Sequence, residues 1–144
     1  MKNLSIIFLV MFLFLSGCAQ KNSGKSQGQQ SSYLSLITIH QGDSIKLDNP
    51  EVFIQIWVLF NLEQKKWLNE LDDLKLSNQN YLTNVDEMDT FSAEFMARKR
   101  KEFYGKFNLT EDDIFNYNKE HFEDISRFLD DNPEYKTAYE ESSK

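Results

Sequence analysis

Apolar side chains recur every three or four residues along the stretch that follows Pro50. The steps are 4, 3, 4, 3, 4 and 3, which is the period of one face of an α-helix. The positions on this face are Phe53, Trp57, Phe60, Gln64, Trp67, Leu71 and Leu74. The opposite face of the first half is apolar too, at Ile54, Val58, Leu59 and Leu62. The pattern therefore predicts a long helix whose first half is covered on both sides and forms the centre of the core.

Two further helices are indicated by their capping residues and by apolar stripes of their own. The first begins near Asn84 and ends at Gly105, a residue type common at helix ends. Its stripe is Val85, Met88, Phe91, Phe95, Met96, Phe103 and Phe107. The second begins at Thr110, where a capping threonine precedes acidic residues that favour the helix dipole. Its predicted inner face is Ile114, Phe115, Phe122, Ile125, Phe128 and Leu129.

Both prolines of the chain stand at a helix start. Asp48-Asn49-Pro50-Glu51 opens the long helix, and Asp131-Asn132-Pro133-Glu134 opens a short last helix. Proline is tolerated in the first turn, and the acid that follows it favours the dipole. The last helix is expected to pack back through Tyr135, Ala138 and Tyr139, and residues 140–144 are expected to fray.

The segment 33–49 carries a different pattern. Tyr33 to Ile39 is apolar and partly β-branched, residues 40–44 read as a turn, and Ile45-Lys46-Leu47 alternates. This favours a small β-hairpin, which would have to lie on the helices because a lone two-stranded ribbon is barely stable. One short helix over 33–40, ending near Gly42, is the alternative.

Composition agrees with a mostly helical fold. Of the 144 residues, 14% are aromatic, while only five are Gly and two are Pro. Few chain breakers favour long helices over many short strands, and large aromatic side chains allow a small domain to build a core. We therefore predict an all-α, or nearly all-α, domain over residues 33–144. It would be a small bundle of three longer helices and a short C-terminal helix, preceded by a short irregular or β segment.

The first eighteen residues form a unit of their own. Lys2 supplies a positive charge, and an apolar run from Leu4 to Leu15 is broken only by Ser5. A membrane-spanning helix needs about 20 residues, so this run has instead the length of a signal-peptide core. The run ends in Leu15-Ser16-Gly17-Cys18, which resembles the lipobox of bacterial lipoproteins: Leu, two small residues, then Cys.

That resemblance implies a signal peptide over residues 1–17 and a mature chain that begins at Cys18. The cysteine sulfur would carry a diacylglyceryl thioether and the new amine an acyl group, and several acyl chains anchor a protein stably. Residues 19–32 contain no large apolar residue and are expected to be a flexible tether. An ordinary secretory signal with a coincidental cysteine is the alternative.

The resemblance also implies a location. The protein would be lipid-anchored in the bacterial cell envelope. The outer membrane is favoured where one exists, because Ala19 is not the aspartate that retains many such lipoproteins at the inner membrane. We expect no cofactor other than the covalent lipid on Cys18.

The net charge of the mature chain indicates which classes of partner it can bind. Without Lys2, 15 basic residues stand against 23 acidic ones, a net charge of −8. We expect no nucleic-acid partner and no basic face for anionic lipid, because both need surplus positive charge. The basic cluster Arg98-Lys99-Arg100-Lys101 points in four directions on a helix and is expected to be a solvated flank that pairs with acids such as Asp72 or Asp112. A docking site for an acidic partner or phospholipid heads is the alternative.

His121 is the centre of a candidate polar site. Tyr117 lies one turn before it and Asp124 nearly one turn after, and such a trio can perform acid–base chemistry. The alternative is a core histidine that bonds Asp124 or a backbone carbonyl. His40 is far from His121 in sequence, and Cys18 is the only cysteine, so we predict neither a metal site nor a thiol nucleophile.

The sequence as a whole favours a non-enzymatic envelope lipoprotein that acts by contact with another envelope protein. One alternative is a helical module that binds an apolar ligand or an unfolded polypeptide in a groove lined by Phe and Met. A second alternative is an enzyme centred on His121.

Mass spectrometry of the protein made in its own host tests the anchor. We expect the mature chain to begin at Cys18, with the mass of a diacylglyceryl group on its sulfur and an acyl group on its amine. A bare terminus with an unmodified thiol would contradict the lipoprotein interpretation.

Overall fold

Helices dominate the part of the chain that the structure describes. The structure is a computed structural model and describes residues 34–77 and 84–144. Its helices are α3 (Pro50–Ser77), α4 (Val85–Gly105), α5 (Glu111–Glu120), α6 (Phe122–Asp131) and α7 (Pro133–Ser142). No strand occurs within these two ranges, which confirms the prediction of an all-α domain. The predicted signal peptide, Cys18 and the tether over 19–32 lie outside the described residues.

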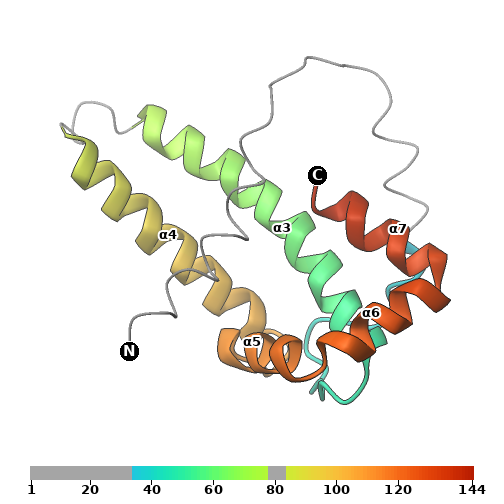
Figure 1. The fold of residues 1–144 in the computed structure, drawn as a ribbon. Coiled ribbons are helices and arrows are strands. Elements are labelled where there is room, and N and C mark those ends of the chain that lie inside the picture. The colour runs from blue at the N-terminus through green and yellow to red at the C-terminus, as the bar shows by residue number, and fades with distance from the viewer. Residues whose placement is uncertain (1–33, 78–83) are drawn as a thin grey trace, which may run out of the picture. The chain divides into compact units, whose positions relative to one another are not determined.

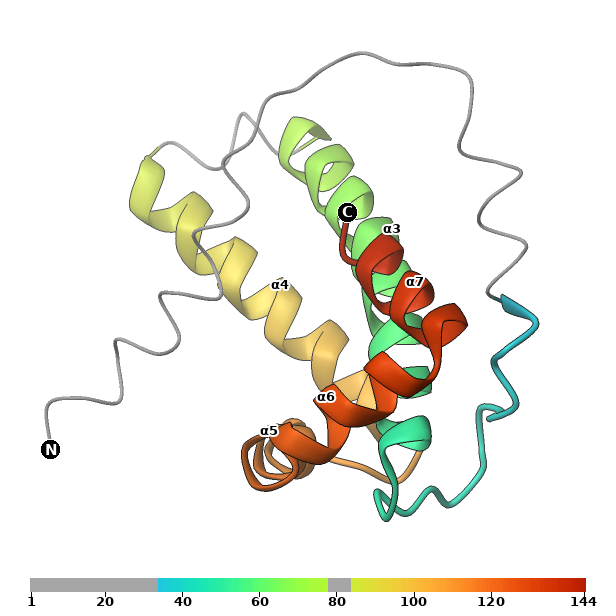
Figure 2. The same cartoon turned by 45° about the vertical axis from the view of Figure 1, so that its right-hand side comes forward.

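Helix α3 is the central element, as its two apolar faces predict. The side-chain oxygen of Asn49 caps its start by accepting a hydrogen bond from the amide of Val52 at 3.0 Å. Helix α4 packs on one side of α3 and α7 on the other, while α5 and α6 lie across the end where α3 begins (Figures 1 and 2). Residues from both faces of the first half are buried, among them Phe53, Ile54, Val58 and Phe60.

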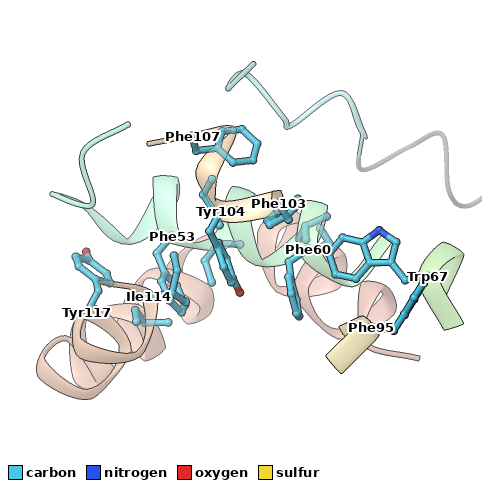
Figure 3. Close-up of a cluster of buried hydrophobic side chains, with 14 of the residues drawn as sticks. Phe53, Phe60, Trp67, Phe95, Phe103, Tyr104, Phe107, Ile114 and Tyr117 are labelled. Atoms are coloured by element: carbon cyan, nitrogen blue, oxygen red, sulfur yellow. The ribbon is translucent and has the colours of Figure 1, made fainter. Parts of the chain in front are cut away.

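Aromatic rings fill the space between α3 and α4 (Figure 3). Phe60 stacks on Tyr104 with ring centroids 5.4 Å apart and meets Phe103 edge-on at 5.6 Å. Phe103 also contacts Trp67 at 5.9 Å and Phe107 at 5.4 Å. Such pairs contribute roughly 0.5–1.5 kcal/mol each beyond the area they bury. The later part of the predicted stripe, from Phe91 to Phe107, is therefore the core face, whereas Met88 is half-buried and Val85 is exposed.

Helix α7 runs parallel to α3 and is held by contacts along its whole length. Tyr135 donates a hydrogen bond to Glu51 at 2.6 Å, and Tyr139 stacks on Trp57 at 5.6 Å. At the far end, the amide of Asn61 donates to the hydroxyl oxygens of Ser142 and Ser143 at 3.2 Å each. The prediction that residues 140–144 fray is wrong, because α7 continues to a fully buried Ser142 that Asn61 holds in place.

The third predicted helix is divided into α5 and α6 at His121. Helix α5 begins as predicted, with Thr110 and Asp113 forming a reciprocal capping box. His121 ends α5 and precedes α6 with φ −117° and ψ 22°, outside the helical region. Ile114 and Ile125 are buried as predicted, but the prediction for Phe115 and Phe122 is wrong: they are 44% and 67% exposed. Tyr117, on the neighbouring face of α5, is buried instead.

The segment 34–49, called the strap below, is irregular, and the predicted hairpin does not form. Two of its backbone amides donate hydrogen bonds to the α4–α5 loop: Gly42 to the carbonyl of Lys106 at 2.9 Å, and Ile45 to that of Phe107 at 3.2 Å. The strap therefore pairs with this loop rather than with itself. The alternative of a helix over 33–40 is not found either, because only Leu34 is helical, residues 35–36 form a turn and residues 37–40 are irregular.

A buried glutamine fixes the start of the strap to α3. Gln55 is 2% exposed, and its side-chain oxygen accepts from the amides of Thr38 and Ile39 at 2.8 and 3.2 Å and from the Thr38 hydroxyl at 3.2 Å. Its amide nitrogen donates to Glu51 at 3.3 Å. One side chain thus satisfies two backbone donors that an irregular segment would otherwise leave unpaired.

The basic cluster pairs with acids, as expected of a solvated flank. Lys99 lies 2.7 Å from Glu70, and Arg100 lies 3.0 Å from Glu111. These partners are close in sequence to the predicted Asp72 and Asp112 but differ from them. Such surface pairs contribute little to stability, about 0–1 kcal/mol each.

Replacing Gln55 by leucine should detach the start of the strap. The change removes the acceptor of two backbone amides, those of the exposed Thr38 and the half-buried Ile39, so we expect the free energy of unfolding to fall by about 0.5–1.5 kcal/mol. Urea unfolding measures the loss, and hydrogen exchange should quicken at Thr38 and Ile39. Gln64→Leu, on the same helix at a half-buried position, is the matched control. An equal loss in both variants would contradict the role given to Gln55.

Candidate functional site

A cavity of about 200 Å³ lies beneath the strap. The strap contributes Ile39, His40 and Gln41, α3 contributes Leu59 and Glu63, and the end of α4 and the loop after it contribute Phe103 and Phe107. The two Phe rings are almost fully buried and belong to the aromatic core. The cavity is therefore built from three separate parts of the chain, and the hydrogen bonds of the strap hold those parts together.

Glu63 is the acidic residue of this cavity. Its side chain is 28% exposed and lies 2.6 Å from the ammonium of Lys66, one turn further along α3. His40, on the strap, is exposed, and its backbone amide donates to the carboxylate of Asp43 at 2.8 Å. The cavity thus has an apolar floor, a carboxylate, and an imidazole and an amide side chain.

The structure also brings together the predicted trio of Tyr117, His121 and Asp124. The imidazole of His121 stacks on the Tyr117 ring with centroids 4.4 Å apart, and its Nδ1 lies 3.5 Å from a carboxylate oxygen of Asp124. Asp124 also lies 3.6 Å from Arg127. The His121 side chain is 43% exposed, so it is not the core histidine of the alternative interpretation. At the helix junction, His121 and Asp124 lie at the surface, whereas Tyr117 is buried.

This junction carries exposed aromatic residues among acids. Phe115 on α5 and Phe122 on α6 are exposed, and so are eight acidic residues on these two helices. The eight are Glu111, Asp112, Asp113, Glu120, Glu123, Asp124, Asp130 and Asp131. Residues 111–144 contain eleven Asp and Glu against four Lys and Arg, a net charge of −7 that equals the net charge of the whole chain. We call the exposed Phe115, Phe122 and these acids the α5–α6 surface.

Buried tyrosines have raised pKa values. Burial raises the pKa of Tyr117, and the negative charges of Asp124 and Asp48 raise it further. Burial, together with the hydrogen bond to Glu51, raises the pKa of Tyr135 to about 12. Burial alone raises the pKa of Tyr139. These hydroxyls stay protonated at neutral pH, so Tyr117 is a poor proton donor beside His121.

The residues of the cavity are the ones that sequence reasoning missed. His40 and Glu63 belong to different predicted elements, and the pattern of the strap suggested a hairpin rather than a cover for α3 and α4. A Gly-Xaa-Ser-Xaa-Gly spacing at Gly24-Lys25-Ser26-Gln27-Gly28 was missed as well. It lies outside the described residues, and the sequence before it is polar, whereas a catalytic serine of this kind follows an apolar strand sequence.

No family model, curated protein or solved structure matches this chain. Within residues 34–77 and 84–144, no helix combines the length and apolarity needed to cross a membrane. The same residues contain no cluster of three or more His, Cys, Asp or Glu side chains that could hold a metal ion.

Alkaline unfolding tests the environment of Tyr117. A tyrosine whose pKa is raised in the folded state stabilises the fold below its unfolded pKa of about 10, and this contribution is lost as the pH rises through the folded value. Tyr117→Phe should leave stability at pH 7 nearly unchanged and make the decline above pH 10 shallower, by up to about 1.4 kcal/mol per pH unit.

Tyr135→Phe is the comparison for this experiment. It also removes an alkaline-titrating group, but it loses the hydrogen bond to Glu51, so stability at pH 7 should fall by about 1 kcal/mol. Urea unfolding between pH 7 and 11 measures both variants. A Tyr117→Phe variant that declines as steeply as the parent would refute the burial argument.

Proposed function

We propose that this protein is a lipid-anchored lipoprotein of the bacterial cell envelope that acts by non-enzymatic contact with another envelope protein. The anchor rests on the lipobox-like Leu15-Ser16-Gly17-Cys18 after an apolar run. The helical domain then works close to a membrane surface, within reach of the tether over residues 19–32.

The observation that carries the contact function is the α5–α6 surface. Phe is among the residue types most often buried, yet Phe122 is 67% exposed and Phe115 44% exposed. Aromatic residues are enriched in the centres of protein interfaces. The surrounding acids favour a partner with a basic surface, because complementary charge speeds and orients association.

The alternative functions receive less support. A pocket for a drug-sized or lipid-sized ligand has a volume of about 300–1,000 Å³, and the cavity under the strap is smaller than that. At the helix junction, Tyr117 is buried with a raised pKa, and Asp124 is shared between His121 and Arg127. That geometry suits a stabilised helix junction better than proton transfer.

Crosslinking in the native host tests the contact surface. A photo-reactive amino acid placed at Phe122 of the full chain should capture one envelope protein, whereas the same group at the exposed Thr137 of α7 should not. Phe122→Ser should then weaken binding of the purified partner by about tenfold or more, because an interface aromatic is a typical binding hot spot.

Two further measurements complete this experiment: the salt dependence of binding and the thermal stability of the variant. Binding should weaken with added salt, because the attraction between exposed charges is screened. The thermal unfolding midpoint of Phe122→Ser should match that of the parent, since the side chain is exposed. Identical crosslinks from positions 122 and 137, or unchanged affinity in Phe122→Ser, would overturn the proposal.

A further inference from the structure

The cavity under the strap is preformed. Gln55 fixes residues 38 and 39, and the amides of Gly42 and Ile45 are bonded to the loop after α4. His40 and Gln41 are held between these two sets of bonds. The wall that they contribute is therefore set by backbone hydrogen bonds before any ligand arrives.

The size of the cavity restricts its ligand to a small group. A protein cavity of roughly 150 Å³ takes up one benzene molecule. About 200 Å³ therefore holds a short alkyl chain with one polar head, and not a fatty acid or a peptide segment. The half-buried Leu59 and Ile39 provide most of the apolar surface against which such a chain would pack, because Phe103 and Phe107 are only 2% and 1% exposed.

The charge of the cavity selects the polar head. Glu63 is the lining residue with a formal charge at neutral pH, and a carboxylate repels an acidic head and attracts an ammonium. An ammonium has three hydrogen-bond donors, and the side chains of Glu63 and Gln41 both offer acceptors.

A contact within the chain shows that Glu63 already accepts this group. The ammonium of Lys66 lies 2.6 Å from the Glu63 carboxylate, although the Lys66 side chain itself is largely exposed. A surface pair of this kind is weak and readily exchanged. Lys66 therefore competes with an incoming ammonium for Glu63.

We propose that the cavity beneath the strap binds a primary alkylammonium group, supplied by a small free amine or by a lysine side chain of another protein. The alkyl chain packs on Leu59 and Ile39, and the ammonium bonds Glu63 in place of Lys66. The α5–α6 surface has no part in this site, so Phe122→Ser leaves the binding unchanged. An experiment can therefore contradict ammonium binding in the cavity without contradicting partner binding at the α5–α6 surface, and the reverse.

An NMR titration of the full chain in detergent micelles tests this site. n-Butylammonium chloride should shift the Leu59 methyl signals saturably, whereas n-butanol and sodium butyrate should not. Glu63→Gln should abolish the shift. Asp73→Asn, which removes the same charge from an exposed position of α3, should retain it. No saturable shift, an equal response to butanol, or retained binding in Glu63→Gln would overturn the proposal.

Lys66→Gln provides a test in the opposite direction. Removing the competing ammonium should tighten butylammonium binding by about two- to fivefold, the range expected for loss of a surface ion pair. A structural defect would weaken binding instead, so tightening separates a binding site from damage to the fold. Unchanged or weaker binding in Lys66→Gln would contradict the competition.

The source of the ammonium is decided by a second pair of probes. Nα-acetyl-lysine methylamide carries the same group on a peptide backbone, and its norleucine counterpart lacks the charge. Binding of the lysine compound at least as tight as that of butylammonium supports a lysine of a partner protein. Binding of butylammonium alone supports a small free amine.

Discussion

A helix that is apolar on two opposite faces has to be covered from two directions, and this constraint on α3 shapes the whole domain. One face is covered by α4, through the rings around Phe60 and Phe103. The other is covered by α7 and α6, with Tyr139 stacked on Trp57. A single partner helix would leave one of these faces in water, so the chain returns to α3 after α4 and α5 have formed.

Polar groups inside this arrangement decide which segments do the covering. Hydrophobic contact is non-directional, but a buried amide requires partners at fixed positions. Gln55 binds the backbone amides of residues 38 and 39, and Asn61 binds the hydroxyls at the end of α7. Each of these amides sits on α3 among apolar neighbours and gives one covering segment its register.

The sequence predicted those features that depend on local periodicity and capping. The helix starts at Asn49, Asn84 and Thr110 were predicted because capping side chains act within one turn. The conformation of the strap was not predicted, because it depends on hydrogen-bond acceptors that are distant in sequence, such as Gln55. Nor was the break at His121, which lies within an apolar pattern that reads as one continuous helix. The cavity around Glu63 escaped prediction because it joins residues from three elements.

The contacts between α3 and α7 also bear on how the molecule is assembled. Tyr135 and Glu51 are 84 residues apart in sequence, and Ser142 and Asn61 are 81 apart. Contacts between residues so far apart in sequence form slowly. Because synthesis starts at the N-terminus, α3 is made long before α7. One apolar face of α3 therefore stays exposed until almost the whole chain has been synthesised. A nascent chain in this state is vulnerable to aggregation until the end of α7 packs on α3, where Asn61 bonds the hydroxyl of Ser142.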